Sequence, residues 1–138
     1  MKAHLEAIRT AINAACPVDL WSPDPGRIPP WMSIEAPSWA PDPDECMCGT
    51  PHQMEAAIRV RAIAGTPDGV EVLLRSARVA LGNGRRLDLT VPGREVSIRW
   101  ERGEFIGLDP DATIPGTNRH PAVGVDTYTL TSHPKEAP

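Results

Sequence analysis

The chain has 138 residues, which is the size of one ordinary domain and leaves little room for a second domain with its own core. Its 14 basic and 18 acidic residues give a net charge of -4, which disfavours a duplex-DNA binder that relies on neutralising phosphates. Hydrophobic residues make up 41% and charged residues 23%, as in globular proteins and unlike disordered tails. Because 16 prolines and 11 glycines are about a fifth of the chain, we expect long, stiff loops.

The sequence has no run of about 18 apolar residues, and charged side chains interrupt the apolar pattern of its first fifteen residues. We therefore expect neither a membrane span nor a signal peptide, and a protein made in the cytoplasm. The three cysteines, Cys16, Cys46 and Cys48, lack the spacing of a disulfide framework. Free thiols are expected, as in a reducing compartment.

The first third of the chain predicts one helix and two short strands. Apolar residues at steps of three and four predict an amphipathic helix over residues 2–15, which Pro17 ends. Residues 18–21 can form a strand, and the prolines of residues 22–30 then indicate a rigid connector. Strand character returns in residues 31–36.

The middle of the chain predicts a long loop, a strand and a second helix. Residues 37–51 collect prolines and acids into a loop of uncommon length. Residues 53–64 alternate apolar with polar side chains, the period of a strand with one wet face. Thr66-Pro67-Asp68-Gly69 is typical of a turn, and helical spacing follows over residues 70–81 until Gly82-Asn83-Gly84 ends it.

The last third of the chain predicts a hairpin and a final strand. Residues 85–91 and 95–101 flank Pro92-Gly93, a turn signal. Residues 103–121 are irregular. A final strand is predicted over residues 122–131, with Val123, Val125, Thr127 and Thr129 on one side.

This order of elements predicts an α+β fold, with two helices packed on one face of a mostly antiparallel sheet and long proline-rich loops. We expect a single domain over residues 1–132 and a flexible C-terminal end over residues 133–138.

A metal or catalytic centre has weak support in the sequence. Cys46, Cys48 and His52 offer soft ligands, with Asp44 or His120 as a possible fourth. Only one residue separates the two cysteines and no second ligand pair exists, so we expect no metal, no cofactor and no enzyme. A small Cys/His metal-binding module or enzyme is the alternative.

Charge is distributed unevenly along the chain. Residues 21–57 hold one base and six acids, whereas residues 58–102 hold nine bases and five acids. Such counts describe either solvated faces or complementary surfaces that meet between copies of the chain. Arginine outnumbers lysine twelve to two, which favours bidentate contacts between subunits.

Six segments together carry a resemblance to a known family. They are, in chain order, LEAIRTAI, PPWMSIEAP, MEAAIRVRAIA after an acidic cysteine-containing loop, VEVLLRSARVAL, VPGREVSIRW and VGVDTYTLTSHP. In this order the chain resembles, over nearly its whole length, the tail terminator (tail completion) proteins of siphophages, the bacteriophages with long non-contractile tails, and especially the actinobacteriophage type. The chain departs from the pattern in residues 39–48, which are unusually rich in proline.

The resemblance implies a virion structural protein of the neck that acts in head–tail joining. It implies a homohexameric ring on the head-proximal end of the tail tube, where the ring halts addition of the major tail tube protein. The ring would present a surface to the head-tail connector or stopper protein, and genomic DNA would pass through its lumen without specific binding.

The acids of the long loop are expected to engage the tube or a neighbouring subunit, with two arginines as counter-charges. The residues expected at partner contacts are Trp39, Asp42, Asp44, Glu45, Arg85 and Arg86. Two further alternatives stay open. One is another neck component, a stopper or head-completion protein, and the other is a monomeric binding domain for a foreign partner.

Overall fold

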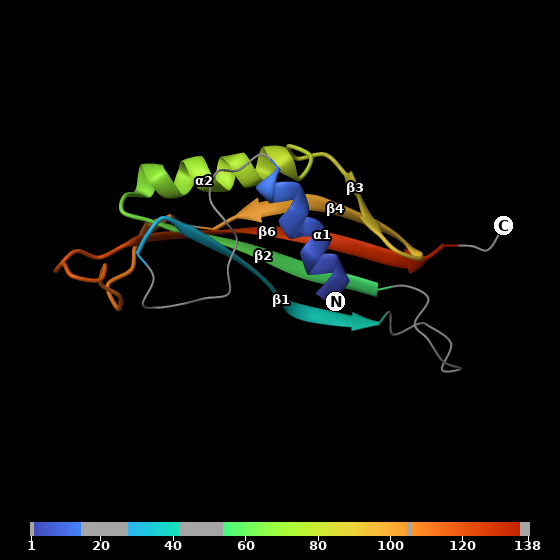
Figure 1. Ribbon diagram of the computed structural model, residues 1–138, viewed down its shortest axis with the longest axis horizontal. Coiled ribbons are helices and arrows are strands. Elements are labelled where there is room, and N and C mark those ends of the chain that lie inside the picture. The colour runs from blue at the N-terminus through green and yellow to red at the C-terminus, as the bar shows by residue number, and fades with distance from the viewer. Residues whose placement is uncertain (1, 15–27, 42–53, 105, 136–138) are drawn as a thin grey trace.

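The computed structural model describes residues 2–14, 28–41, 54–104 and 106–135 (Figure 1). The elements of these ranges are α1 (Lys2–Asn13), β1 (Trp31–Pro41), β2 (Met54–Ala64), α2 (Pro67–Ala80), β3 (Leu87–Val91), β4 (Arg94–Gly103), β5 (Gly107–Leu108) and β6 (Ala122–Pro134). The strands form one sheet in the order β1-β2-β6-β4-β3, with β5 also paired to β6. Every described strand pair is antiparallel, so the α+β prediction is confirmed.

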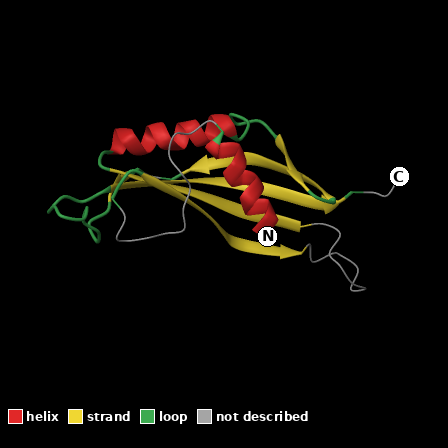
Figure 2. Cartoon of the chain, in the orientation of Figure 1, coloured by secondary structure: helices red, strands yellow, loops and turns green. Residues whose placement is uncertain are grey.

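Both helices cover the same face of the curled sheet (Figure 2). α2 packs on β2 and β6, while α1 contacts α2 and both outer strands, β1 and β3. A single apolar core lies between these layers, and it joins Ile8 of α1 and Val70 of α2 to Ile58 of β2. Neither described helix is long and apolar enough to cross a bilayer.

The alternating pattern of residues 53–64 correctly predicts strand β2 and which of its side chains face the core. Every second side chain of β2, from Met54 to Ala64, is buried under the helices, whereas Glu55 is exposed on the opposite face. This opposite, helix-free face is lined by polar and charged side chains such as Arg59 and Thr129. The predicted hairpin is also confirmed as β3 and β4.

The second helix begins three residues earlier than predicted. Thr66 is its N-cap, because the Thr66 side-chain oxygen accepts a hydrogen bond from the Gly69 amide at 3.1 Å and Pro67 occupies the first turn. A Thr-Pro pair serves a turn and a helix start equally well, so the interpretation of residues 66–69 as a turn was wrong. The predicted end is confirmed, since Gly82, Asn83 and Gly84 all have positive φ.

The first sheet strand is longer than predicted. β1 continues to Pro41, so residues 37–41 of the predicted loop are strand, and a bulge between Glu35 and Ser38 separates its two halves. An edge strand tolerates proline because one side of its backbone has no partner to lose. Residues 42–51 of that loop lie outside the described residues, as do the predicted strand over residues 18–21 and most of the connector over residues 22–30.

The last strand also extends past its predicted end. His133 and Pro134 pair with Glu95 and Arg94 of β4, and the Lys135 amide donates to the Gly93 carbonyl at 3.1 Å. The predicted flexible end therefore begins too early, because β4 supplies pairing positions down to its first residue. A two-residue strand, β5, also interrupts the stretch predicted as irregular.

Candidate functional site

The residues expected at partner contacts lie in three different places. The backbone of Trp39 belongs to β1 and pairs with Ala56. Asp42, Asp44 and Glu45 lie outside the described residues. Arg85 and Arg86 are exposed between α2 and β3.

Strand register fixes how far apart these places are. One row of paired residues crosses the sheet from edge to edge: Trp39, Ala56, Leu130, Ile98 and Leu87. The row spans four strand spacings, or about 19 Å along the sheet at about 4.8 Å per spacing. Within one subunit, the strand that leads into Asp42 and the arginines that precede β3 therefore lie at opposite edges (Figure 1).

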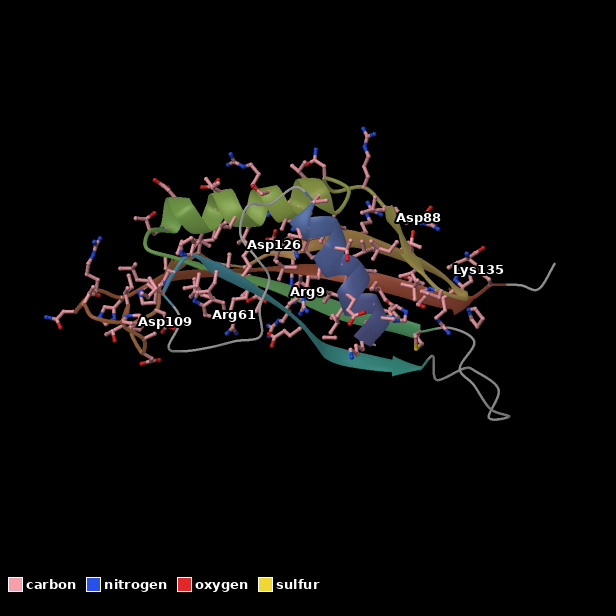
Figure 3. The ribbon with its side chains drawn as sticks, in the orientation of Figure 1. Arg9, Arg61, Asp88, Asp109, Asp126 and Lys135 are labelled. Carbon is pink, nitrogen blue, oxygen red and sulfur yellow. The ribbon has the colours of Figure 1, made fainter. Side chains whose placement is uncertain are left out.

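A polar hollow of about 340 Å³ lies at the β3 edge, in the hairpin of β3 and β4. Among the residues that line it are Arg86, Asp88, Glu95, His133 and Lys135. The side chains of Asp88 and Lys135 stand at this end of the sheet (Figure 3).

Each acid of the hollow already has a basic partner. Arg86 Nε lies 3.4 Å from Asp88 Oδ1, and His133 Nε2 lies 2.7 Å from Glu95 Oε2. Lys135 has no carboxylate within 4.0 Å among the described residues. The Arg86–Asp88 pair is highly exposed and adds little stability, so Arg86 is free to exchange partners.

An ion pair of a different kind lies beneath α2. Arg78 donates to both carboxylate oxygens of Asp126 at 2.9–3.2 Å, and the Asp126 side chain is only 1% exposed. The guanidinium also lies 4.4 Å from the centre of the Trp100 ring, within cation–π range. Because both oxygens are occupied by Arg78, Asp126 fastens α2 to β6 and is not free to act as a catalytic base.

Tyr128 is a neighbour of this pair that the sequence analysis did not single out. Its side chain is fully buried and its hydroxyl has no hydrogen-bond partner among the described residues. Burial, with a smaller contribution from Asp126, raises the pKa of Tyr128 far above its ordinary value, against an opposing effect of Arg78. The phenol is therefore neutral at physiological pH.

One serine–histidine pair has the composition of a nucleophile and a base. Ser132 Oγ lies 2.9 Å from His4 Nε2 and 2.6 Å from Arg94 Nε, which donates to it. Ser132 is 0% exposed and His4 only 4%. A substrate could not reach this oxygen without displacement of α1, so the pair joins α1 to the sheet.

Metal-ligating residues do not gather in the described part of the chain. Cys46, Cys48 and His52 lie outside it. His120 is exposed, and its Nδ1 lies 2.7 Å from the Ala112 carbonyl oxygen.

A search against protein-family models gives no match. No curated protein matches the sequence either. These comparisons therefore assign no family to the chain.

Proposed function

We propose that the protein is a bacteriophage tail terminator, a non-enzymatic virion component that forms a hexameric ring on the head-proximal end of the tail tube. The ring halts addition of tube protein and offers its outer surface to the head-tail connector. The resemblance of six ordered segments supports this role, and the geometry of the sheet edges supports the mode of assembly.

The observation that carries the proposal is that β1, the strand that leads into the acidic residues, and the arginines that precede β3 belong to opposite edges of one sheet. A closed ring of identical subunits needs a patch that meets a different patch of its neighbour. The acidic residues follow β1 directly, whereas Arg85 and Arg86 precede β3, four strand spacings away. Contact between the two sets is therefore most easily made between neighbouring copies.

Chain length supports contact between copies over contact within one copy. Asp44 lies three residues beyond Pro41, a reach of about 10 Å at full extension. Pro41 lies in the same row of paired residues as Leu89, two residues along β3 from Leu87. The chain therefore leaves β1 in the direction that leads away from Arg86. The acids would have to turn back and cross the sheet to meet the arginines of their own subunit.

Side chains, and not a continuous sheet, make the proposed contact. Pro37 and Pro41 have no amide hydrogen to donate, and the bulge between Glu35 and Ser38 interrupts the ladder of β1. Prolines and bulges of this kind keep an edge strand from pairing with another chain. The exposed arginine side chains are suited to bidentate contacts with carboxylates.

The overall charge is compatible with a lumen that lets DNA through. A net charge of -4 does not favour capture of phosphates, so DNA could pass without being held.

Charge reversal tests the role of the edges. Tube protein is polymerised with each variant, and tube lengths and capped ends are counted by electron microscopy. We expect the triple variant D42K/D44K/E45K and the double variant R85E/R86E each to lose capping. We expect the five changes combined in one chain to restore it, because the contact is rebuilt with opposite signs.

A matched control is Arg119→Glu, which reverses an exposed arginine of the loop before β6. This variant should cap normally. Capping by the triple acid variant at the normal level would contradict the proposed contact. Binding to the connector without any effect on tube ends would instead favour another neck component.

A further inference from the structure

The first turn of α1 is held to the sheet by a second buried polar cluster, separate from the Arg78–Asp126 pair. His4 of α1, Arg94 of β4 and Ser132 of β6 share one oxygen, Ser132 Oγ, at the distances given above. Because His4 Nε2 and Arg94 Nε lie 2.9 and 2.6 Å from the same atom, they are within about 5.5 Å of each other. Any charge on His4 would therefore face the guanidinium at short range.

Hydrogen bonding in the cluster suits a neutral imidazole. A neutral ring carries one N–H, and its other nitrogen accepts. His4 Nδ1 is buried and has no hydrogen-bond partner among the described residues, as is also true of Arg94 Nη2. A protonated His4 would carry a second N–H with no acceptor, in addition to a positive charge beside Arg94.

The carboxylates of the neighbouring elements do not compensate this charge. They are Glu6, Glu35, Asp68, Glu71, Asp88, Glu95, Glu101 and Asp126, and Glu101 is exposed and accepts a hydrogen bond from Thr129. None lies within 4.0 Å of Arg94 or His4. The acids of β1, β3 and β4 occupy positions on the helix-free face of the sheet. Of the others, Asp126 and Glu71 are held by arginines, while Glu6 and Asp68 are exposed.

The other ionisable groups of these elements are cationic or neutral. Lys2 and Arg9 add positive charge on α1 itself, and Arg9 Nε is buried without a hydrogen-bond partner among the described residues. Tyr128 of β6 stays a neutral phenol. The surroundings of His4 therefore oppose its protonation from every described side.

Burial is the largest cause that lowers the pKa of His4 below its ordinary value of 6.5, and the charges of the amino terminus and of Arg94 add to it. A histidine with a lowered pKa in the folded state contributes stability that is present above the unfolded pKa. That stability is lost as the pH falls below 6.5 and through the folded pKa.

We propose that His4, Ser132 and Arg94 form an acid-sensitive latch whose protonation at His4 releases α1 from the sheet while the rest of the fold persists. The sheet is suited to persist because β2, β4 and β6 pair along most of their lengths. α1 has only 12 residues, which is too short for a stable isolated helix, so it depends on this cluster and on the packing of Ile8 and Ile12. The latch does not depend on the proposed function.

Release of α1 would affect both edges of the sheet together. α1 contacts β1 and β3, the two outer strands, across the helix-covered face. An acid pulse would thus expose apolar surface next to both edges at once.

Amide hydrogen exchange tests the latch. Exchange of α1 and of β6 is measured between pH 7.5 and pH 5 and corrected for the intrinsic pH dependence of exchange. We expect the opening constant of α1 to rise several-fold in acid, with a ceiling of tenfold for each unit of pKa difference between the unfolded and folded states, while β6 stays protected. Absence of a rise in α1 would overturn the proposal.

Three variants separate the latch from general acid effects. His4→Gln keeps an amide that can bond to Ser132 and does not titrate, so its α1 exchange should not respond to acid. Arg94→Gln removes the facing charge and should reduce the response. His133→Gln changes an exposed histidine bonded to Glu95 and should respond like the wild type.

Titration of the wild-type histidines by NMR keeps the proposal testable if His4→Gln fails to fold. The pKa of His4 should lie below its ordinary value of 6.5, and Arg94→Gln should move this pKa upward. An acid response of α1 in His4→Gln equal to that of the wild type would overturn the latch. So would a pKa of His4 at or above 6.5.

Discussion

Each helix is linked to strand β6 by a buried polar cluster, and the two clusters differ in whether their positive charge is compensated. α2 is held by Arg78 and Asp126, in which a buried carboxylate receives a bidentate guanidinium. α1 is held by His4, Ser132 and Arg94, in which the guanidinium meets a hydroxyl and a neutral ring. A compensated pair holds at any pH that leaves the acid ionised, whereas an uncompensated cluster holds only while the histidine is neutral.

The difference indicates that the attachment of α2 does not depend on a histidine, whereas the attachment of α1 depends on a neutral His4. α2 also packs more closely on the sheet, on β2 and β6, which are inner strands. α1 reaches the two outer strands, where fewer neighbours support it.

Loss of the acid in the α2 pair should have the largest effect on stability. Asp126→Ala leaves the partly buried Arg78 without its partner, and we expect a loss of about 3 kcal/mol in the free energy of unfolding. Urea unfolding measures it. Arg75→Ala, which removes an exposed pair with Glu71, is the control and should change stability by less than about 0.5 kcal/mol. Equal losses in the two variants would contradict the contrast between buried and exposed pairs.

Close packing of α2 on β6 gives the next largest effect. A Cβ added at Gly124 would lie 2.7 Å from Val70 Cγ1 and 3.1 Å from Leu74 Cδ1 of α2. Gly124→Ala should therefore cost about 1–3 kcal/mol, because two side chains of the helix must move. Gly65→Ala is the control, since no atom lies within 4 Å of the added carbon. A thermal midpoint for Gly124→Ala equal to that of the control would show that α2 is not seated as described.

Removal of the unpartnered hydroxyl beneath α2 should have the smallest effect. Tyr128→Phe deletes a buried hydroxyl without a described hydrogen-bond partner, so we expect stability to be unchanged or to rise by up to about 1 kcal/mol. Chemical unfolding checks this value. A loss above 1 kcal/mol would mean that the hydroxyl has a partner in the folded protein.

Local patterns in the sequence were sufficient for most elements of the fold. The alternation of residues 53–64 and the Pro92-Gly93 turn each specify structure through neighbours in the chain, so β2 and the hairpin could be predicted. The ends of β1 and β6 could not, because β2 and β4 decide how far those strands pair.

Strand β6 shows why the buried clusters escaped sequence analysis. The expectation that Val123, Val125, Thr127 and Thr129 share one side is confirmed by register. The fully buried Tyr128 and Leu130 lie on the other side, together with Asp126. An aspartate in the core is tolerable only beside Arg78, 48 residues earlier, and a single sequence does not reveal that pairing.

For the candidate site, the sequence predicted which residues contact a partner but not where those residues lie in the fold. Arg85 and Arg86 are exposed as an interface requires, and Trp39 has a defined row in the sheet. That β1, which leads into the acids, and β3, which follows the arginines, form opposite edges is a matter of strand order, which composition and spacing do not contain.

Cross-linking between the two edges tests the ring most directly. The variant D42C/R86C, with the three native cysteines changed to serine, is treated with a short bis-maleimide linker after assembly on tube ends. We predict a ladder of covalent species that stops at six subunits, and no ladder from D42C or R86C alone. Dimers from either single variant, or only intramolecular cross-links in the double variant, would contradict a ring built from unlike edges.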